Sequence, residues 1–320
     1  MLFMGIDTSC YTTSIALLNA PGGLLDDRRI VLPVPAGEKG LKQSTALFFH
    51  WRNLPALMSE ALTRERALEI AAIAVSARPR PCEESYMPVF SAGTALAESI
   101  ASLLGVPLVK TSHQEGHIMA GLWSAGVESL KSFLVLHLSG GTTELLKADK
   151  CATNPLRFKL EVMGGSTDIQ AGQLIDRVGV AMGLSFPSGR ELEKTAATYN
   201  TKEKLPVIPS SVKECQMSFS GAETLAKAYL RKNYPLPAVA RAVEHCIATS
   251  VEKALRRAVL DTGTNEILLV GGVAGNSYIR SRLIKRLEHQ AVGARMYFPD
   301  IKHCSDNAVG AALIARSIVN

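Results

Sequence analysis

The 320-residue sequence lacks any long uninterrupted hydrophobic run, so we expect no membrane-spanning helix and no membrane partner. It also lacks a basic stretch ahead of the apolar residues in "MLFMGID", which disfavours a signal peptide. The six cysteines are scattered and form no C-x-x-C pair. This disfavours both a disulfide framework and a structural zinc knuckle, and it indicates reduced thiols. We therefore expect a cytoplasmic protein.

The composition that is present suits a globular protein, with 47% hydrophobic and 20% charged residues. The length allows two domains, each with its own core. The net charge of +6 favours a polyanionic partner. Each single cluster of basic residues is better explained as a solvated helix face or loop.

Strand-like and helix-like segments alternate along the chain, and the pattern restarts near Phe133. Residues 2–34 predict three strands, and residues 44–62 predict a helix that Pro55 should kink or split. The stretches "MGIDTSCYTTSIALL" and "LHLSGGTTELLKA" both read as strand, polar turn with threonine, and returning strand. This weak similarity predicts an α/β protein of two duplicated halves.

The remaining patterns assign elements to each half. The expected strands are 70–77, 107–110, 158–164, 266–270 and 294–299, and the expected helices are 90–105, 169–182, 191–199, 222–232, 237–261 and 305–319. We expect one lobe over 1–130 and a second over 131–302, with the closing helix, about 303–320, packing back on the first lobe.

Two histidines in "HQEGH", His113 and His117, open a predicted helix and share one helical face because they lie four residues apart. The zinc-protease motif H-E-x-x-H places its glutamate directly after the first histidine. Here Glu115 lies two positions on, about 200° around an ideal helix. It should face away from the histidines, which disfavours peptidase chemistry.

A metal site would need a third ligand from elsewhere in the chain. The stretch "HCSDNAVG" offers Asp306, at the predicted start of the last helix, with His303 as the alternative. Two histidines and one aspartate suit iron or zinc alike. The competing interpretation is a histidine pair that caps the helix and bonds to backbone.

Three turns of small residues lie at strand ends, at 7–9, 139–143 and 271–276. Such turns leave backbone N–H groups accessible to a phosphate, and a helix start behind them adds a favourable dipole. None has the spacing of a P-loop, and each alone is more often only a turn. Their matching places in two halves favour a nucleotide held between two lobes.

Two aspartates fall in the middle of the second half. Asp168 is expected at the N-cap or in the first turn of the 169–182 helix, with Asp176 two turns later on nearly the same face. Carboxylates facing a cleft could bind ribose hydroxyls or a second metal. The alternative is a solvated helix face.

Taken in order, these motifs resemble one family. The segments are "GIDTSC", "HQEGH", "LSGGTTE", "AGQLIDRVGVAMGLSFPSG", "SFSGAET", "GGVAGN" and "CSDNA". Together they resemble the universal tRNA threonylcarbamoyladenosine transferase family, once described as O-sialoglycoprotein endopeptidases. The resemblance covers nearly the whole chain. It implies the two-lobed fold of actin, sugar kinases and heat-shock ATPases, made of two ribonuclease-H-like halves.

The resemblance also implies an activity and its site. The family uses a divalent metal to move a threonylcarbamoyl group from its adenylate to N6 of adenosine 37, in tRNAs that read ANN codons. It implies iron, zinc or magnesium on His113, His117 and Asp306, and catalytic roles for Asp7 and Ser9. ATP or the adenylate would contact Ser139, Gly140, Gly141, Thr142, Asp168, Gly172, Asp176, Gly189, Gly272 and Asn276. The implied partners are tRNA, a paralogous non-catalytic subunit and a small ATPase.

Several positions depart from the family pattern: Tyr11, Thr12, Thr142, Ile169 and Gln173. Two alternative functions therefore stay open. One is a regulatory paralogue that binds metal and nucleotide without transfer. The other is an ATPase or small-molecule kinase of the same fold, for which Asp7 would be the catalytic carboxylate.

Overall fold

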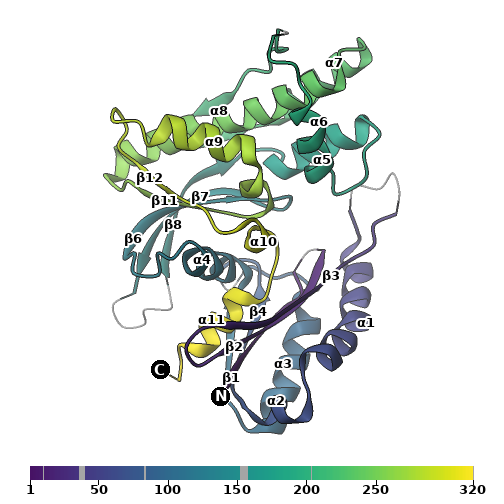
Figure 1. Ribbon diagram of the computed structural model, residues 1–320, viewed down its shortest axis with the longest axis vertical. Helices are drawn as coiled ribbons and strands as arrows, with labels where there is room; N and C mark the ends of the chain where they lie inside the picture. Colours follow the sequence, from purple (N-terminus) through teal and green to yellow (C-terminus); the bar gives the residue numbers. More distant parts are fainter. Residues whose placement is uncertain (10, 36–39, 83, 152–157, 203, 320) are drawn as a thin grey trace.

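The computed structural model describes residues 1–9, 11–35, 40–82, 84–151, 158–202 and 204–319, which form two β-sheets covered by helices (Figure 1). Cys10, the last residue of the "GIDTSC" motif, lies outside the described residues. None of the described helices is both long and apolar enough to cross a membrane.

The first sheet has five strands in the order β3-β2-β1-β4-β5. The strands are β1 (Leu2–Asp7), β2 (Thr12–Asn19), β3 (Leu24–Val31), β4 (Ile70–Arg78) and β5 (Leu108–Ser112). The first three form an antiparallel meander, and β4 and β5 then add in parallel on the other side of β1.

The second sheet repeats this plan with seven strands in the order β12-β11-β6-β7-β8-β10-β9. Its strands are β6 (Ser132–Leu138), β7 (Thr143–Lys150), β8 (Phe158–Ser166), β9 (Ser211–Lys213), β10 (Gln216–Ser218), β11 (Glu266–Val270) and β12 (Arg295–Tyr297). The meander β6-β7-β8 corresponds to β1-β2-β3, and the parallel β11 and β12 correspond to β4 and β5. The two predicted halves therefore share one topology, and the hairpin β9–β10 is an addition to the second.

The helices form three layers around these sheets (Figure 1). Their bounds are α1 (Gln43–Ala61), α2 (Arg64–Leu68), α3 (Phe90–Leu104), α4 (His113–Ser124), α5 (Ala171–Ala181), α6 (Gly189–Ala197), α7 (Ser220–Arg231), α8 (Leu236–Thr262), the 3₁₀ turn η1 (Gly272–Gly275), α9 (Ser277–Leu287), α10 (Ile301–Cys304) and α11 (Val309–Arg316). Helices α1 and α3 cover the outer face of the first sheet, and α5 to α9 cover the outer face of the second. Helices α4 and α11 share one core between the sheets.

The closing helix packs against the first sheet. A Cβ atom on Gly5 of β1 would collide with the backbone of Ala312 in α11, so the two elements approach as closely as glycine permits. The strands of the first sheet all precede residue 113, and those of the second follow residue 131. The lobe boundary near residue 130 stays a prediction.

Two helix predictions differ from the structure. Pro55 does not split the first helix, since α1 runs continuously from Gln43 to Ala61 with Pro55 exposed on it. The predicted closing helix 305–319 is wrong in its bounds, because α11 begins only at Val309 and ends at Arg316, and the short helix α10 lies just before residue 305. Asn307 holds the turn between them, since its amide donates to the Ser305 carbonyl (2.9 Å) and accepts from the Val309 N–H (3.0 Å).

Candidate metal and nucleotide site

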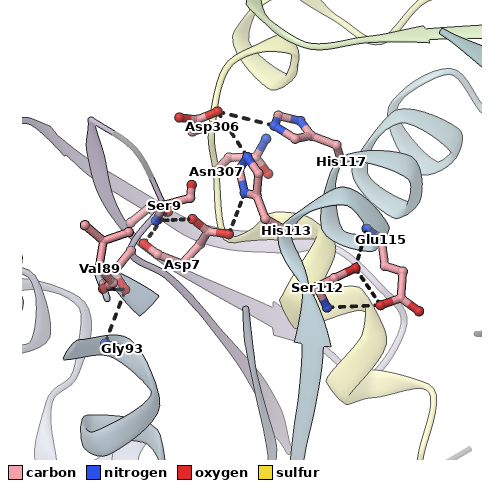
Figure 2. A network of polar contacts seen from close by, with 12 residues as sticks. Asp7, Ser9, Val89, Gly93, Ser112, His113, Glu115, His117, Asp306 and Asn307 are labelled. Carbon is pink, nitrogen blue, oxygen red and sulfur yellow. Dashed lines mark hydrogen bonds and ion pairs between the residues drawn. The ribbon is translucent and has the colours of Figure 1, made fainter. Parts of the chain in front are cut away.

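The start of α4 is fixed by a capping box immediately after β5. The Ser112 hydroxyl accepts the Glu115 N–H at 3.2 Å, and the Glu115 carboxylate accepts the Ser112 N–H at 3.0 Å. Glu115 is thereby turned back toward the strand, away from the histidines (Figure 2). His113 and His117 project together from the opposite face of the helix.

Asp306 meets this histidine pair from the turn between α10 and α11 (Figure 2). Its Oδ1 lies 3.5 Å from Nε2 of His113 and 3.3 Å from Nε2 of His117. The ligand atoms of the three residues all lie within 4.8 Å of one another, so they could hold one metal ion. His303 lies elsewhere, with its ring against Trp123 and its Nδ1 3.9 Å from Asp27.

Asp7, at the end of β1, orients the first histidine. Its Oδ2 lies 2.9 Å from Nδ1 of His113, and its Oδ1 accepts the N–H of Ser9 at 2.8 Å. With the proton on Nδ1 shared with Asp7, Nε2 of His113 is left to face Asp306. A carboxylate behind a ligating imidazole is typical of metal sites, because it fixes the tautomer and the ring orientation.

The electrostatics of this cluster favour a cation. Burial alone would lower the pKa of His113, but the carboxylates of Asp7 and Asp306 outweigh it and raise that pKa to about 10. Burial opposes ionisation of Asp306, yet hydrogen bonds from His113 and His117 hold its pKa well below the usual range. Burial and the positive charge of His113 lower the pKa of His117. The carboxylates of Asp7 and Asp306 and the imidazolium of His113 together carry a net negative charge in the protein interior.

A third histidine, which the sequence analysis did not single out, lies beside the pair. His137 belongs to β6, and its ring centroid is 4.8 Å from that of His117 and 6.4 Å from that of His113. Burial and the charges on the neighbouring histidines lower its pKa well below 6.5. The sequence does indicate on which face of the strand His137 lies, because side chains alternate along β6 and Phe133, Val135 and His137 share one face.

The turn after β6 is shaped as a small concave loop at the start of α5. The Ser139 N–H donates to the Thr142 carbonyl (2.7 Å), and the Ser139 hydroxyl accepts the Thr142 N–H (3.0 Å). The Gly172 N–H, in the first turn of α5, donates to the Ser139 carbonyl at 3.1 Å. A Cβ on Gly172 would lie 2.6 Å from backbone atoms of Ser139 and Gly140, so this approach requires glycine. The positive end of α5 therefore abuts the turn.

A cavity of about 90 Å³ lies beside this turn, lined by Tyr11, Gly140, Gln173, Asp176, Arg177 and Phe186. Asp176 accepts the N–H of Ser188 at 2.8 Å, and burial raises its pKa. Tyr11, which follows β1, meets Phe186 of the second half edge to face, with ring centroids 5.7 Å apart. The cavity is a cleft between Tyr11 of the first half and residues of the second, and its volume is smaller than a nucleotide needs.

The prediction that Asp168 caps the helix carrying Asp176 was wrong. Helix α5 begins only at Ala171, after Gln170. The Asp168 carboxylate instead accepts the N–H groups of Phe219 (2.8 Å) and Ser220 (3.1 Å) at the start of α7. These hydrogen bonds overcome partial burial and hold its pKa well below the usual range. Asp168 therefore caps α7, which begins 51 residues later in the sequence, and does not cap α5.

The other predicted nucleotide positions lie at helix starts of the second half. Gly189 opens α6 and Gly272 opens η1, and a Cβ on either would meet nothing within 4 Å. Asn276 caps α9 by accepting the Ile279 N–H (2.9 Å), and its amide donates to Glu244 (2.6 Å). Its side chain is thus engaged within the protein.

A second unpredicted residue, Glu144 of β7, joins the two halves near the histidines. It accepts a hydrogen bond from Gln114 of α4 (2.7 Å) and pairs with Arg80 (3.1 Å). Both partners precede residue 130, so these contacts link the sequence segments of the two expected lobes.

Comparison with known structures shows the fold. An activator of 2-hydroxyisocaproyl-CoA dehydratase from Clostridium difficile with bound ADPNP superposes with a TM-score of 0.56 at 18% identity, over 99% of this chain and 94% of that one. A ROK family glucokinase from Streptomyces griseus in complex with glucose and AMPPNP gives 0.53 at 13% identity, over 99% of both chains. The prediction of a two-lobed fold shared with sugar kinases is confirmed.

Comparison of sequences shows the family. Two proteins named tRNA N6-adenosine threonylcarbamoyltransferase are each 29% identical to this chain. The alignment with the protein from Thermosipho melanesiensis covers 98% of this chain and 93% of that protein. The alignment with the protein from Prochlorococcus marinus subsp. pastoris covers 98% of this chain and 90% of that protein. The family model described as tRNA N6-adenosine threonylcarbamoyltransferase matches residues 44–313. The match includes strands β4 and β5 of the first sheet, helix α4, the whole second sheet and Asp306, and the chain belongs to the tRNA N6-adenosine threonylcarbamoyltransferase family.

Proposed function

We propose that the protein is a metal-dependent transferase that moves a threonylcarbamoyl group from its adenylate to N6 of adenosine 37 in tRNA. The observation that carries this proposal is the meeting of Asp306 with His113 and His117, across 189 residues of sequence, in a chain of this family. A histidine pair that only capped a helix would bond to backbone. Here Ser112 supplies the cap, and both imidazoles face a carboxylate.

The donor set fits a borderline transition metal. Imidazole nitrogen suits iron and zinc, whereas magnesium prefers oxygen ligands, so we propose iron or zinc ahead of magnesium. The buried negative group and the Asp7–His113 hydrogen bond both favour a cation at Nε2. When bound, such an ion supplies Lewis acidity that polarises a carbonyl or neutralises phosphate charge.

The remaining residues would bind and orient the substrates. We assign the phosphate of ATP or of threonylcarbamoyl-adenylate to the Ser139–Thr142 turn at the positive end of α5. Asp176, beside Gly140 in the same cleft, would accept a ribose hydroxyl. In the transfer, N6 of adenosine forms a bond to the carbamoyl carbon as the bond from that carbon to the phosphate oxygen breaks. AMP leaves with the oxygen and takes up the proton that N6 releases.

The structure disfavours the kinase alternative on one specific ground. A kinase or ATPase needs an available carboxylate near the γ-phosphate, and Asp7 is 1% exposed and already shared between His113 and Ser9. We therefore assign Asp7 to positioning His113. The retained His113–His117–Asp306 group likewise favours an enzyme over a regulatory paralogue.

The test is formation of the modified nucleoside by purified protein. Zinc- or iron-loaded protein is incubated with threonylcarbamoyl-adenylate and an unmodified tRNA that reads ANN codons, and digested tRNA is examined by mass spectrometry. We expect the product from wild type, its loss in His117→Ala, and its retention in His303→Leu, a buried histidine outside the site. Absence of product, even with the paralogous subunit and small ATPase of a bacterial relative added, would refute the proposal.

A further inference from the structure

Arg80 is a basic residue in the loop that follows β4. This loop is fixed to the first turn of α4, because the Gln114 N–H donates to the Pro79 carbonyl at 3.1 Å. It is fixed a second time by the Arg80 N–H, which donates to the Ser85 hydroxyl at 3.1 Å. Since Gln114 directly follows His113, these bonds place Arg80 beside the end of α4 that carries the first histidine.

The guanidinium of Arg80 is held by Glu144 of β7. Its Nη2 lies 3.1 Å from Oε1 of Glu144, and Oε2 of the same carboxylate accepts the Gln114 amide at 2.7 Å. Glu144 is the antiparallel partner of His137, and directly opposite residues of an antiparallel pair share one face of the sheet. The ring centroid of His137 lies 4.8 Å from that of His117. Arg80 is therefore fixed next to the imidazoles of the metal site.

This guanidinium keeps hydrogen-bonding capacity beyond Glu144. The Arg80 side chain is 52% exposed, whereas that of Glu144 is only 12% exposed. Among the residues that the structure describes, Glu144 is the single partner of the guanidinium, which has five N–H donors. A guanidinium binds a carboxylate or a phosphate through two parallel hydrogen bonds. The remaining donors of Arg80 can therefore bind an anion that enters between the two halves.

The adenylate of the proposed reaction carries two anionic groups, and the distance between them matches the strands. Its phosphate is assigned to the Ser139–Thr142 turn, which leaves the carboxylate of its threonine. Five bonds separate the carboxyl carbon from the phosphorus, or about 6 Å in an extended chain. The His137–Glu144 pair lies two residues from either end of the turn, and two residues of an antiparallel strand span about 6.8 Å. With its phosphate at the turn, the adenylate would bring its carboxylate to the level of Glu144 and Arg80.

We propose that Arg80 binds the carboxylate of the threonylcarbamoyl group and so selects adenylates derived from an amino acid. This inference rests on the function proposed above and adds a substrate-binding residue to it. Glu144 holds the guanidinium from one edge, while the substrate carboxylate accepts N–H groups from another. The carbonyl that N6 attacks lies between the carboxylate and the phosphate. Anchoring both ends would therefore fix that carbonyl in position beside the histidines.

The experiment compares two stable analogues of the adenylate in which a sulfamate replaces the phosphate. One analogue carries threonine, and the other carries 1-aminopropan-2-ol, which is threonine without its carboxylate. The affinity of zinc-loaded protein for each is measured by isothermal titration. We expect wild type to bind the threonine analogue about 10- to 100-fold more tightly than the other, because hydrogen bonds between two charged groups are among the strongest.

Arg80→Gln should weaken binding of the threonine analogue by about the same factor and leave the affinity for the carboxylate-free analogue unchanged. The matched control is Arg295→Gln, since Arg295 is also an exposed arginine paired with a glutamate of the second sheet, Glu266, at 3.5 Å. This control should bind both analogues as wild type does. If Arg80→Gln does not fold, Arg80→Lys should show the same selective loss to a smaller degree, because it keeps the charge and loses the planar fork.

Four results would overturn the proposal. Equal affinity of wild type for the two analogues would do so whatever the variants show. An Arg80→Gln protein that binds both analogues as wild type does, or that loses affinity for both equally, would make the Arg80–Glu144 pair only a link between the halves. A loss confined to tRNA binding would assign the guanidinium to the tRNA backbone. Failure of both analogues to bind wild type would refute the adenylate site proposed above, and this inference with it.

Discussion

Gly172→Ala should damage the phosphate turn through a single added methyl group. The new Cβ would lie 2.6 Å from the Gly140 nitrogen and 2.6 Å from the Ser139 carbonyl oxygen, where ordinary contact begins at 3.4 Å. Both atoms are backbone and cannot rotate away. The turn must therefore move by roughly 0.8 Å away from α5, and the hydrogen bond from the Gly172 N–H to the Ser139 carbonyl lengthens or breaks.

The size of the effect follows from these two losses. Overpacking of this kind costs about 1–3 kcal/mol and the hydrogen bond contributes about 0.5–1.5 kcal/mol, so the free energy of unfolding should fall by about 2–4 kcal/mol. For a chain of 320 residues that corresponds to a fall in Tm of about 3–6 °C. Displaced N–H groups should also weaken binding of a non-hydrolysable ATP analogue by about 10- to 100-fold, since hydrogen bonds to a charged phosphate are worth about 1.5–3 kcal/mol.

The assays are differential scanning calorimetry and isothermal titration with the analogue. Gly221→Ala is the matched control, because Gly221 is likewise the second residue of its helix, α7, and a Cβ there meets nothing within 4 Å. We expect this control to keep the wild-type affinity and an equal or slightly higher Tm. A Gly172→Ala protein with wild-type Tm and wild-type nucleotide affinity would refute the close approach of α5 to the turn.

Three further predictions concern charge and capping. A proton on His113, whose pKa is about 10, competes with the metal. The Kd for zinc should therefore fall about tenfold for each unit by which the pH rises from 6 to 8. A Kd that does not change with pH would contradict this prediction. Ser112→Ala should lower Tm by about 1–2 °C through loss of about 1 kcal/mol of capping energy while zinc stoichiometry stays at one, and an unchanged Tm would contradict the capping box. Asp168→Ala should lower Tm similarly at pH 7 by uncapping α7. Because the folded-state pKa of Asp168 is depressed below 3.8, its contribution is present above that pH and is lost as pH falls further; a difference in Tm that grew on acidification would refute this assignment.

The repeated fold could be predicted because each half begins with its own local pattern of strand and turn residues. The hairpins that begin at Leu2 and Ser132 both alternate strand, polar turn and strand, and the apolar runs that follow mark the parallel strands. The β9–β10 hairpin was missed because each strand has only three residues, too few to show a period of two. The gap between α10 and α11 was missed because it depends on hydrogen bonds made by one side chain, Asn307.

The candidate site was predictable where spacing on one element decides the geometry. His113 and His117 share a face because they lie four residues apart, and Asp306 is a carboxylate near the start of a helix. The contacts of Asp7, Asp168 and His137 depend on which strand or helix lies opposite. Such partners, 106 residues away for Asp7 and 51 for Asp168, leave no periodic signal in the sequence.

The most direct test of the account is the position of the bound ion. A crystal of the protein soaked with zinc, with data collected on both sides of the zinc absorption edge, would locate it by anomalous scattering. We predict one peak within about 2.0–2.2 Å of Nε2 of His113, Nε2 of His117 and a carboxylate oxygen of Asp306. A peak bound by other residues, or none at these three side chains at saturating zinc, would contradict the account.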